Sequence, residues 1–183
     1  DQKKLVEIEA FLGLDRPWYV QFGTWFSDFI MGDMGNSWRS RIPVSQLLGP
    51  RLIVTLELAG LATLISVIFI GIPNGLLAAK YKSKWQDTAV RVFSLAALSV
   101  PVFWMGSMLI LIFSVYFQWS PPLTWVSPIE DPWVNISMMA LPAFALGLAG
   151  AAPLVRMTRN SVLEVQGQNY IRTARSIGNS EIK

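Results

Sequence analysis

The chain has 183 residues, of which 52% are hydrophobic and 15% are charged, and its formal net charge is +3. A soluble domain averages roughly 25% charged residues, and a chain of this size cannot bury so much apolar surface in water, so the composition favours a membrane protein. The sequence contains neither Cys nor His, which excludes disulfides, thiol and imidazole catalysis, and metal sites built on those ligands.

The N-terminal region, residues 1–51, mixes acidic with basic residues and carries aromatic residues at helical spacing. This spacing predicts a helix over 16–31, with Asp15 as its N-cap and Pro17 in its first turn. An amphipathic helix of this kind can lie on the outer membrane surface, and packing of its aromatic face against membrane helices is an equally good interpretation. The aromatic residues are Trp18, Phe22, Trp25, Phe26 and Phe29.

Three long runs without ionised side chains follow, at Leu58–Ala79, Val92–Ser120 and Val134–Val155. A helix of about 22 residues spans roughly 33 Å, enough to cross a hydrocarbon layer of about 30 Å. We therefore expect three transmembrane helices, at about 52–79, 92–118 and 134–156. Their internal prolines are compatible with helices, because neighbours in a bundle can satisfy the freed backbone groups. Buried core helices of a large soluble protein are the alternative, but these rarely stay uncharged for so long.

The basic residues between and after these runs predict the orientation of the chain. The connection at 80–91 carries Lys80, Lys82, Lys84 and Arg91, whereas the connection at 118–133 has no Lys or Arg. Since positively charged connections stay in the cytoplasm, we expect 80–91 and 156–183 on the cytoplasmic side and 1–51 and 118–133 outside. The basic residues of the last segment are Arg156, Arg159, Arg172, Arg175 and Lys183.

Seven stretches together resemble the permease subunits of ABC importers of the dipeptide, oligopeptide and nickel group. The resemblance covers nearly the whole chain, and it rests on the order and spacing of the stretches rather than on any one motif. They are LGLDRPWYVQF (12–22), GDMGNSWR (32–39), TLELA (55–59), GIPNGLLAA (71–79), SVPVFWMG (99–106), LPAFALGLAG (141–150) and NYIRTARSIGNSE (169–181).

The resemblance implies an all-α membrane helix bundle of the ABC type I importer kind, with residues 1–51 outside the cytoplasm and 52–183 forming the permease domain. Such permeases have about six membrane helices, so this chain resembles a fragment lacking the first and the last ones. The resemblance also implies a location in a bacterial or archaeal inner membrane. Its implied partners are a second permease, two ATP-binding subunits that hold ATP and Mg, an extracytoplasmic solute-binding protein and membrane lipid, with no nucleic acid.

In this family the cytoplasmic segment after the fourth helix couples the permease to the ATP-binding subunit, and segment 160–183 corresponds to its first half. The resemblance assigns the coupling role to Tyr170, Thr173, Ala174, Arg175 and Gly178. The small residues Ala174 and Gly178, four apart, would also give a smooth helical face for a partner groove. The chain departs from the family pattern at 168–169, where acidic residues are common, and at 176–177, where an Ala-Lys pair is common.

The remaining residues indicate no bond-making chemistry. No phosphate-binding G-x-x-x-x-G-K-[ST] motif is present, so any ATP hydrolysis belongs to another chain, and we expect neither enzymatic activity nor a metal site. A structural membrane subunit and a proton-coupled carrier are the alternative functions.

Two further groups of residues are candidates for structural or transport roles. Glu57 abuts the first run, where a carboxylate is a functional candidate by default, but an ion pair with Arg51 is the preferred interpretation. Polar or kinked positions that could line a translocation path for peptides or related small solutes are Ser99, Pro101, Trp104, Gly106, Met138 and Pro142.

Overall fold

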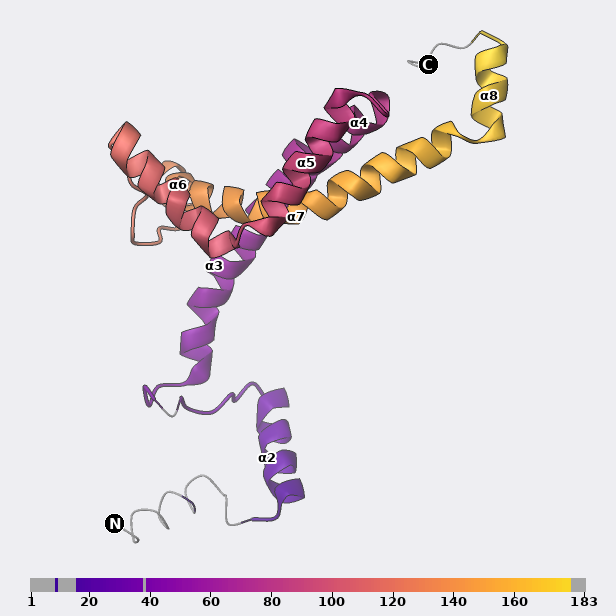
Figure 1. Cartoon of the computed structure of the whole chain (residues 1–183). Helices are drawn as coiled ribbons and strands as arrows, with labels where there is room; N and C mark the ends of the chain where they lie inside the picture. Colours follow the sequence, from indigo (N-terminus) through magenta and orange to yellow (C-terminus); the bar gives the residue numbers. More distant parts are fainter. Residues whose placement is uncertain (1–8, 10–15, 38, 179–183) are drawn as a thin grey trace. The chain divides into compact units, whose positions relative to one another are not determined.

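The computed structural model describes residue 9, residues 16–37 and residues 39–178, and this part of the chain is helical (Figure 1). Its one β feature is an isolated antiparallel bridge between Asn36 and Pro43. The chain divides into two compact units, Asp1–Val54 and Thr55–Lys183.

The first unit contains helix α2 (Trp18–Ile30), within the range expected from the aromatic spacing. Pro17 is the residue that precedes the helix, and no side-chain cap accompanies it; the expected cap, Asp15, lies outside the described residues. The rings of Phe22 and Phe26 stack at a centroid distance of 5.7 Å, and all six aromatic residues of α2 are exposed. α2 therefore presents an aromatic surface that no other part of the described first unit covers.

The first expected membrane helix is a continuous rod of three segments. α3 (Val44–Leu64) leads into a π-helical segment, η1 (Ile65–Gly71), and then into α4 (Ile72–Lys80). The rod is 37 residues long and apolar enough to cross a membrane. The helix begins at Val44, earlier than the expected residue 52, and Pro50 lies inside it without ending it.

The second expected helix, 92–118, is in fact two helices. α5 (Trp85–Ser99) and α6 (Val102–Phe117) are bent by 99° relative to each other. Val100 is extended, with φ −91° and ψ 125°, as expected for a residue that precedes proline, because the Pro101 ring disfavours a helical conformation there. The pair counts as a third membrane span only if both helices are taken together.

The third expected helix, 134–156, lies within a longer one, α7 (Pro132–Gln166), which is also long and apolar enough to cross a membrane. Asp131 caps its start by accepting hydrogen bonds from the backbone N–H groups of Trp133 and Val134, at 3.0 and 3.1 Å. Pro142 and Pro153 lie inside this helix without ending it. A short final helix, α8 (Asn169–Ser176), follows Gly167.

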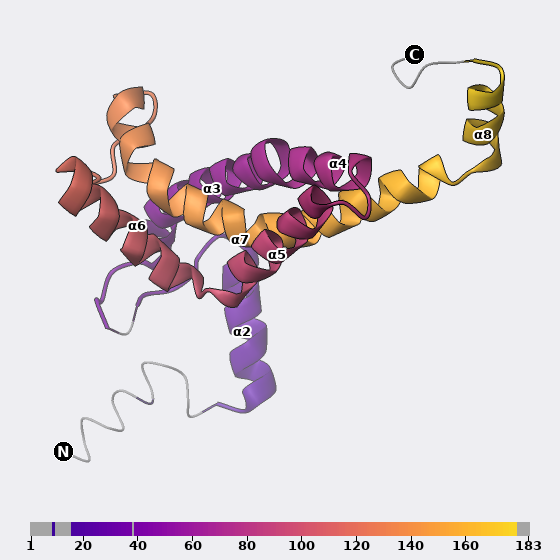
Figure 2. The ribbon, with the colours of Figure 1, turned by 45° about the horizontal axis from the view of Figure 1, so that its top comes forward.

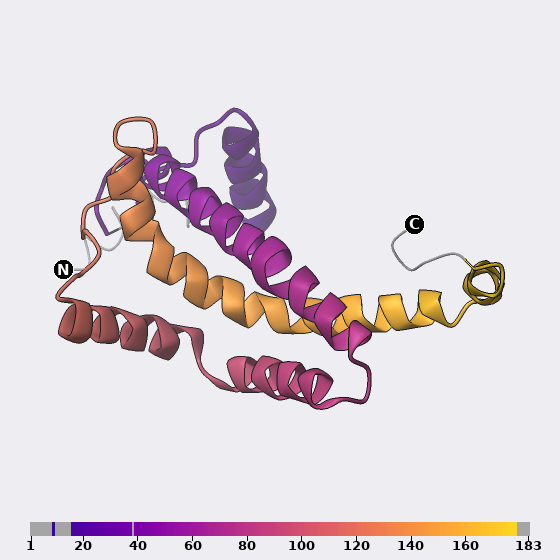
Figure 3. The ribbon, with the colours of Figure 1, turned by 90° about the horizontal axis from the view of Figure 1, so that it is seen from above.

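α7 is the central element of the second unit, packed against η1, α4, α5 and α6 (Figure 2 and Figure 3). Small residues let its neighbours approach closely. A Cβ added at Gly147 would lie 2.8 Å from Cγ2 of Ile65, and one added at Gly75 would lie 2.5 Å from Cβ of Thr158. These contacts fix the position of the α3–α4 rod along α7, because neither backbone can accommodate a larger residue without moving.

The expected outer connection is tied to the helices by two hydrogen bonds. The indole Nε1 of Trp125 donates to the carboxylate of Glu57 at 2.9 Å, and the buried side-chain amide of Asn135 donates to the carbonyl of Val126 at 2.9 Å. The first bond reaches the interior of α3 and the second reaches the start of α7, so both helices hold the same connection in place.

Candidate functional site

The third apolar run ends at Val155, but α7 continues through Arg156 and a more polar sequence as far as Gln166. No proline or glycine interrupts this polar part before Gly167, whose N–H bonds back to the carbonyls of Leu163 and Glu164 at 3.2 and 3.1 Å. α7 is thus one helix that leaves the apolar zone and leads to α8. Any movement of α8 along the α7 axis would act directly on the helix at the centre of the second unit.

α8 carries the residues that the resemblance assigns to coupling. The ring of Tyr170 is exposed, and the hydroxyl of Thr173 donates to the carbonyl of Asn169 at 3.0 Å. Ala174 and Arg175 belong to α8 by their backbone, but their side chains lie outside the described residues. Their roles therefore stay predictions.

Gly178 has a different position from the one that its spacing suggested. α8 ends at Ser176, and Gly178 has φ +85°, so it does not share a helical face with Ala174. That conformation is strained for residues with a Cβ, and it is the one with which helices commonly terminate. Space is not the restriction, because a Cβ at Gly178 would meet nothing within 4 Å. The prediction that Gly178 shares a smooth helical face with Ala174 was therefore wrong. The conformation of Gly178 instead defines the end of α8.

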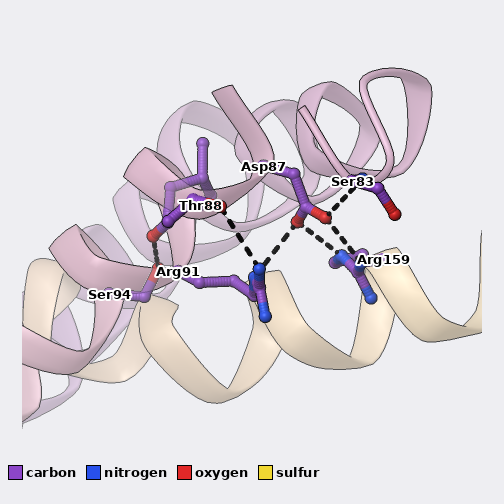
Figure 4. Close-up of polar contacts among 7 residues, drawn as sticks. Ser83, Asp87, Thr88, Arg91, Ser94 and Arg159 are labelled. Carbon is purple, nitrogen blue, oxygen red and sulfur yellow. Dashed lines mark hydrogen bonds and ion pairs between the residues drawn. The ribbon is translucent and has the colours of Figure 1, made fainter. Parts of the chain in front are cut away.

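Beside the polar part of α7 lies a buried carboxylate, Asp87, in the first turn of α5 (Figure 4). Its side chain is 1% exposed and accepts two hydrogen bonds from Arg159, from Nε at 2.8 Å and from Nη2 at 2.7 Å. The backbone N–H of Ser83 donates to it at 3.1 Å, and Nε of Arg91 lies 3.3 Å away. Every strong hydrogen-bonding direction of the carboxylate is therefore occupied.

The electrostatics of this cluster keep Asp87 ionised. Asp87 belongs to the polar connection outside the apolar runs, and the hydrogen bonds from Arg159 lower its pKa to about 2 against the opposing effect of burial. The carboxylate is charged at any pH from 5 to 8. A buried ion pair of two-point geometry holds its partners in one arrangement, and removing one partner leaves the other charge uncompensated.

The ion pair joins two parts of the second unit that the sequence separates widely. Asp87 follows the turn after α4, whereas Arg159 lies on the part of α7 that leads to α8. The pair therefore connects the turn after α4 to the part of α7 that leads to α8. The described residues contain no cluster of three or more potential metal ligands.

Asp87 was not among the site residues predicted from the sequence, because only the positive charge of the 80–91 connection was considered. A signal was nevertheless present. Asp87 is the one acid in that basic connection, and Arg159 stands just beyond a run whose helix is expected to return to the same side. An isolated acid and a basic residue at matching ends of two membrane helices are candidates for an ion pair.

The structure gives Glu57 a partner other than the expected one, since its carboxylate accepts the hydrogen bond from Trp125. The ion pair with Arg51 stays a prediction. Of the six expected path residues, Ser99 and Pro101 lie at the bend between α5 and α6, and Trp104 and Gly106 lie in the first half of α6. Met138 and Pro142 lie half-buried on α7. Their role in a translocation path also stays a prediction.

Residues 71–183 match the family model described as binding-protein-dependent transport system inner membrane component. The chain belongs to this family. The match begins at the last residue of η1 and includes both partners of the Asp87–Arg159 pair, α7 and α8. Both the resemblance found in the sequence and the all-helical membrane fold that it implied are confirmed.

Curated members of the family are similar along nearly the whole chain. A putative peptide transport system permease protein of Brucella abortus (strain 2308) is 41% identical over 174 residues, covering 95% of this chain and 55% of the relative. The dipeptide transport system permease protein DppB of Escherichia coli (strain K12) is 39% identical over 196 residues, with 94% and 57% covered. The glutathione transport system permease protein GsiC of Escherichia coli O6:H1 (strain CFT073) is 37% identical over 170 residues, with 93% and 53% covered. The chain spans about half the length of these relatives.

Proposed function

We propose that this chain forms part of the membrane permease of an ATP-driven importer for peptides or related small solutes, and that α8 couples it to a separate ATP-binding subunit. The identity of about two fifths with permeases named for peptide, dipeptide and glutathione transport supports the cargo class. The observation that carries the coupling role is the continuity of α7 from its apolar part to the residue before Gly167. A force applied at α8 would pass through only two non-helical residues, Gly167 and Gln168, before it reached the helix at the centre of the bundle.

The same proposal includes the expected partners. A second permease would complete the path, two ATP-binding subunits would hold ATP and Mg, and an extracytoplasmic protein would deliver the solute. The segments 80–91 and 156–183 would face the cytoplasm, and residues 1–51 and 118–133 would face outward. This chain would contribute binding surfaces and movement, with ATP hydrolysis on its partners.

Gly178 provides the test, in the full-length permease assembled with its partner subunits. Gly178→Val places a β-branched residue at φ +85°, where such residues are strongly disfavoured. We expect the variant to lose most substrate-stimulated ATP hydrolysis and to retain the ATP-binding subunits less well. Gly178→Asn is the matched control, because Asn tolerates positive φ. This variant should keep most of the substrate-stimulated ATP hydrolysis and most of the binding to the ATP-binding subunits.

The two measurements also separate this proposal from a structural membrane subunit. Unchanged ATP hydrolysis and unchanged subunit retention in Gly178→Val would contradict the coupling role of α8. Equal loss in Gly178→Val and Gly178→Asn would show that the partner requires the small size of glycine rather than its backbone conformation.

A further inference from the structure

We propose that the cavity between α5 and α7 binds the headgroup of an anionic phospholipid, with the phosphate held by Arg91 and Arg156. The cavity has a volume of about 230 Å³, and one of its lining residues, Arg91, contacts Asp87. It is lined by Arg91, Ser94, Leu95, Leu98, Ala152 and Arg156. Both helices belong to the second unit and pack against each other.

The spacing of the lining residues explains why a hollow forms there. The four α5 residues follow one another at intervals of three, one and three, which places them on one helix face, and the two α7 residues are four apart on theirs. Ala152 and Ser94 are buried and small, so they leave space between the helices. The hydroxyl of Ser94 donates to the carbonyl of Val90 at 2.8 Å. Its hydrogen is therefore already used within α5.

The charges of the cavity favour an anion. Asp87 accepts hydrogen bonds from two nitrogens of Arg159, Nε and Nη2, and has only a longer contact with Arg91. Within the described part of the chain, Arg156 has no hydrogen-bond or ion-pair partner. Arg91, Arg156 and Arg159 carry three positive charges, and the only negative charge among these four residues is that of Asp87. Two positive charges therefore remain uncompensated. The side chain of Arg91 is 53% exposed, and Arg156 is exposed too, so both guanidinium groups are accessible to a ligand.

The apolar side of the cavity distinguishes a lipid from a free anion. Leu95 and Leu98 are 65% and 45% exposed and continue from Arg91 into the uncharged run. The arginines stand where the apolar runs end, which is the depth of lipid phosphates in a membrane. A guanidinium pair at headgroup level with leucines on the hydrocarbon side fits a phosphate ester that carries an acyl chain. Basic pockets between membrane helices recognise anionic headgroups in this way.

The experiment uses the full-length permease complex in detergent with equal amounts of phosphatidylglycerol and phosphatidylcholine, and native mass spectrometry to count the lipids retained. We expect selective retention of phosphatidylglycerol. Each arginine near a membrane surface contributes about a fivefold factor in affinity, so Arg156→Gln should weaken retention about fivefold. The double variant with Arg91→Gln should weaken it by roughly 25-fold.

Two variants serve as controls. Arg156→Lys keeps the charge and should retain the lipid, whereas Lys82→Gln removes an exposed charge that does not line the cavity and should change nothing. Equal retention of the two lipids by the unmodified complex would overturn the proposal, as would unchanged retention in Arg156→Gln. Displacement of phosphatidylglycerol by an equal concentration of inorganic phosphate would also overturn it, since the site would then recognise a free anion. If another segment of the complex fills the cavity, the unmodified complex will show no preference for phosphatidylglycerol, and that result would also overturn the proposal.

Discussion

Asp87 shows how one side chain can connect elements that are far apart in the sequence. Its carboxylate is shared among the turn at Ser83, the α5 residue Arg91 and the α7 residue Arg159. Arg159 contributes two short hydrogen bonds from a largely buried position, whereas Arg91 contributes one longer contact from a half-exposed position. Since screening by water weakens the second contact, the two arginines differ in importance although both face the same carboxylate.

This difference gives a prediction for Asp87→Asn. The substitution removes the charge but keeps the size, so Arg159 loses its counter-charge in a buried place. We expect a loss of about 3 kcal/mol in stability, at the lower end of the range for buried pairs because Arg159 keeps some solvent contact. The measurement is the thermal unfolding midpoint of the full-length permease complex in detergent.

Arg91→Gln is the matched control for this prediction, and we expect it to change stability by less than about 1 kcal/mol. The charge-swapped pair Asp87→Arg with Arg159→Asp should recover part of the loss of Asp87→Asn. Equal destabilisation by Asp87→Asn and Arg91→Gln would contradict the assignment of the stronger contact to Arg159.

Gly75 gives a second prediction at the residue scale. A Cβ at this position would lie 2.5 Å from Cβ of Thr158 and 3.0 Å from the carbonyl oxygen of Val155. Gly75→Ala should therefore separate α4 from α7 and destabilise the complex by about 1–3 kcal/mol. Gly60→Ala is the control, because a Cβ at Gly60 meets nothing within 4 Å and alanine favours the helix. The same unfolding midpoints test both, and a neutral Gly75→Ala would argue against close packing there.

At the scale of helices, the apolar runs predicted where membrane helices lie but did not predict the bend between α5 and α6. Pro101, Pro142 and Pro153 are alike in the sequence, each inside an apolar run. The last two lie inside the continuous α7, whose packing against η1, α4, α5 and α6 holds the helix together despite the missing hydrogen bonds. Whether a proline bends its helix therefore also depends on the packing around it, which a single sequence does not contain.

Removal of the restraint at Pro101 gives the prediction for this scale. In Pro101→Ala the residue before it is free to become helical, and the 99° bend between α5 and α6 should decrease. Spin labels at Val92 and Tyr116, both exposed, would report a distance longer by on the order of 10 Å, given the 1.5 Å rise per residue. Pulsed electron spin resonance on the full-length permease measures this distance.

The control for the bend is Pro142→Ala, which should leave the labelled distance unchanged because α7 is already continuous at that position. An unchanged distance in Pro101→Ala would mean that the packing of α6 against α7, rather than the proline, maintains the bend.

At the scale of the whole chain, the sequence predicted the class of protein and the approximate helices, whereas the arrangement of the candidate site needed the structure. The resemblance located the coupling segment at 160–183, but it gave no indication that α7 extends unbroken to Gln166. The Asp87–Arg159 pair links residues 72 positions apart, and no local pattern encodes a contact of that kind. Gly178 illustrates the same limit, because its spacing from Ala174 suggested a helical face and its backbone ends the helix instead.

The orientation of the molecule supplies the last prediction. The 80–91 connection carries the positive charges and the 118–133 connection has none, so the first should face the cytoplasm and the second the outside. Single cysteines at Lys82 and Leu123 test this in cells that express a full-length permease without other cysteines; Leu123 is 97% exposed and Lys82 is exposed too. A membrane-impermeant maleimide should label Leu123→Cys in intact cells and Lys82→Cys only after permeabilisation. Both variants should label equally after denaturation, which controls for expression. Labelling of Lys82→Cys in intact cells, with protection of Leu123→Cys, would invert the orientation and move Arg91, Arg156 and α8 to the outer side, away from any cytoplasmic ATP-binding subunit.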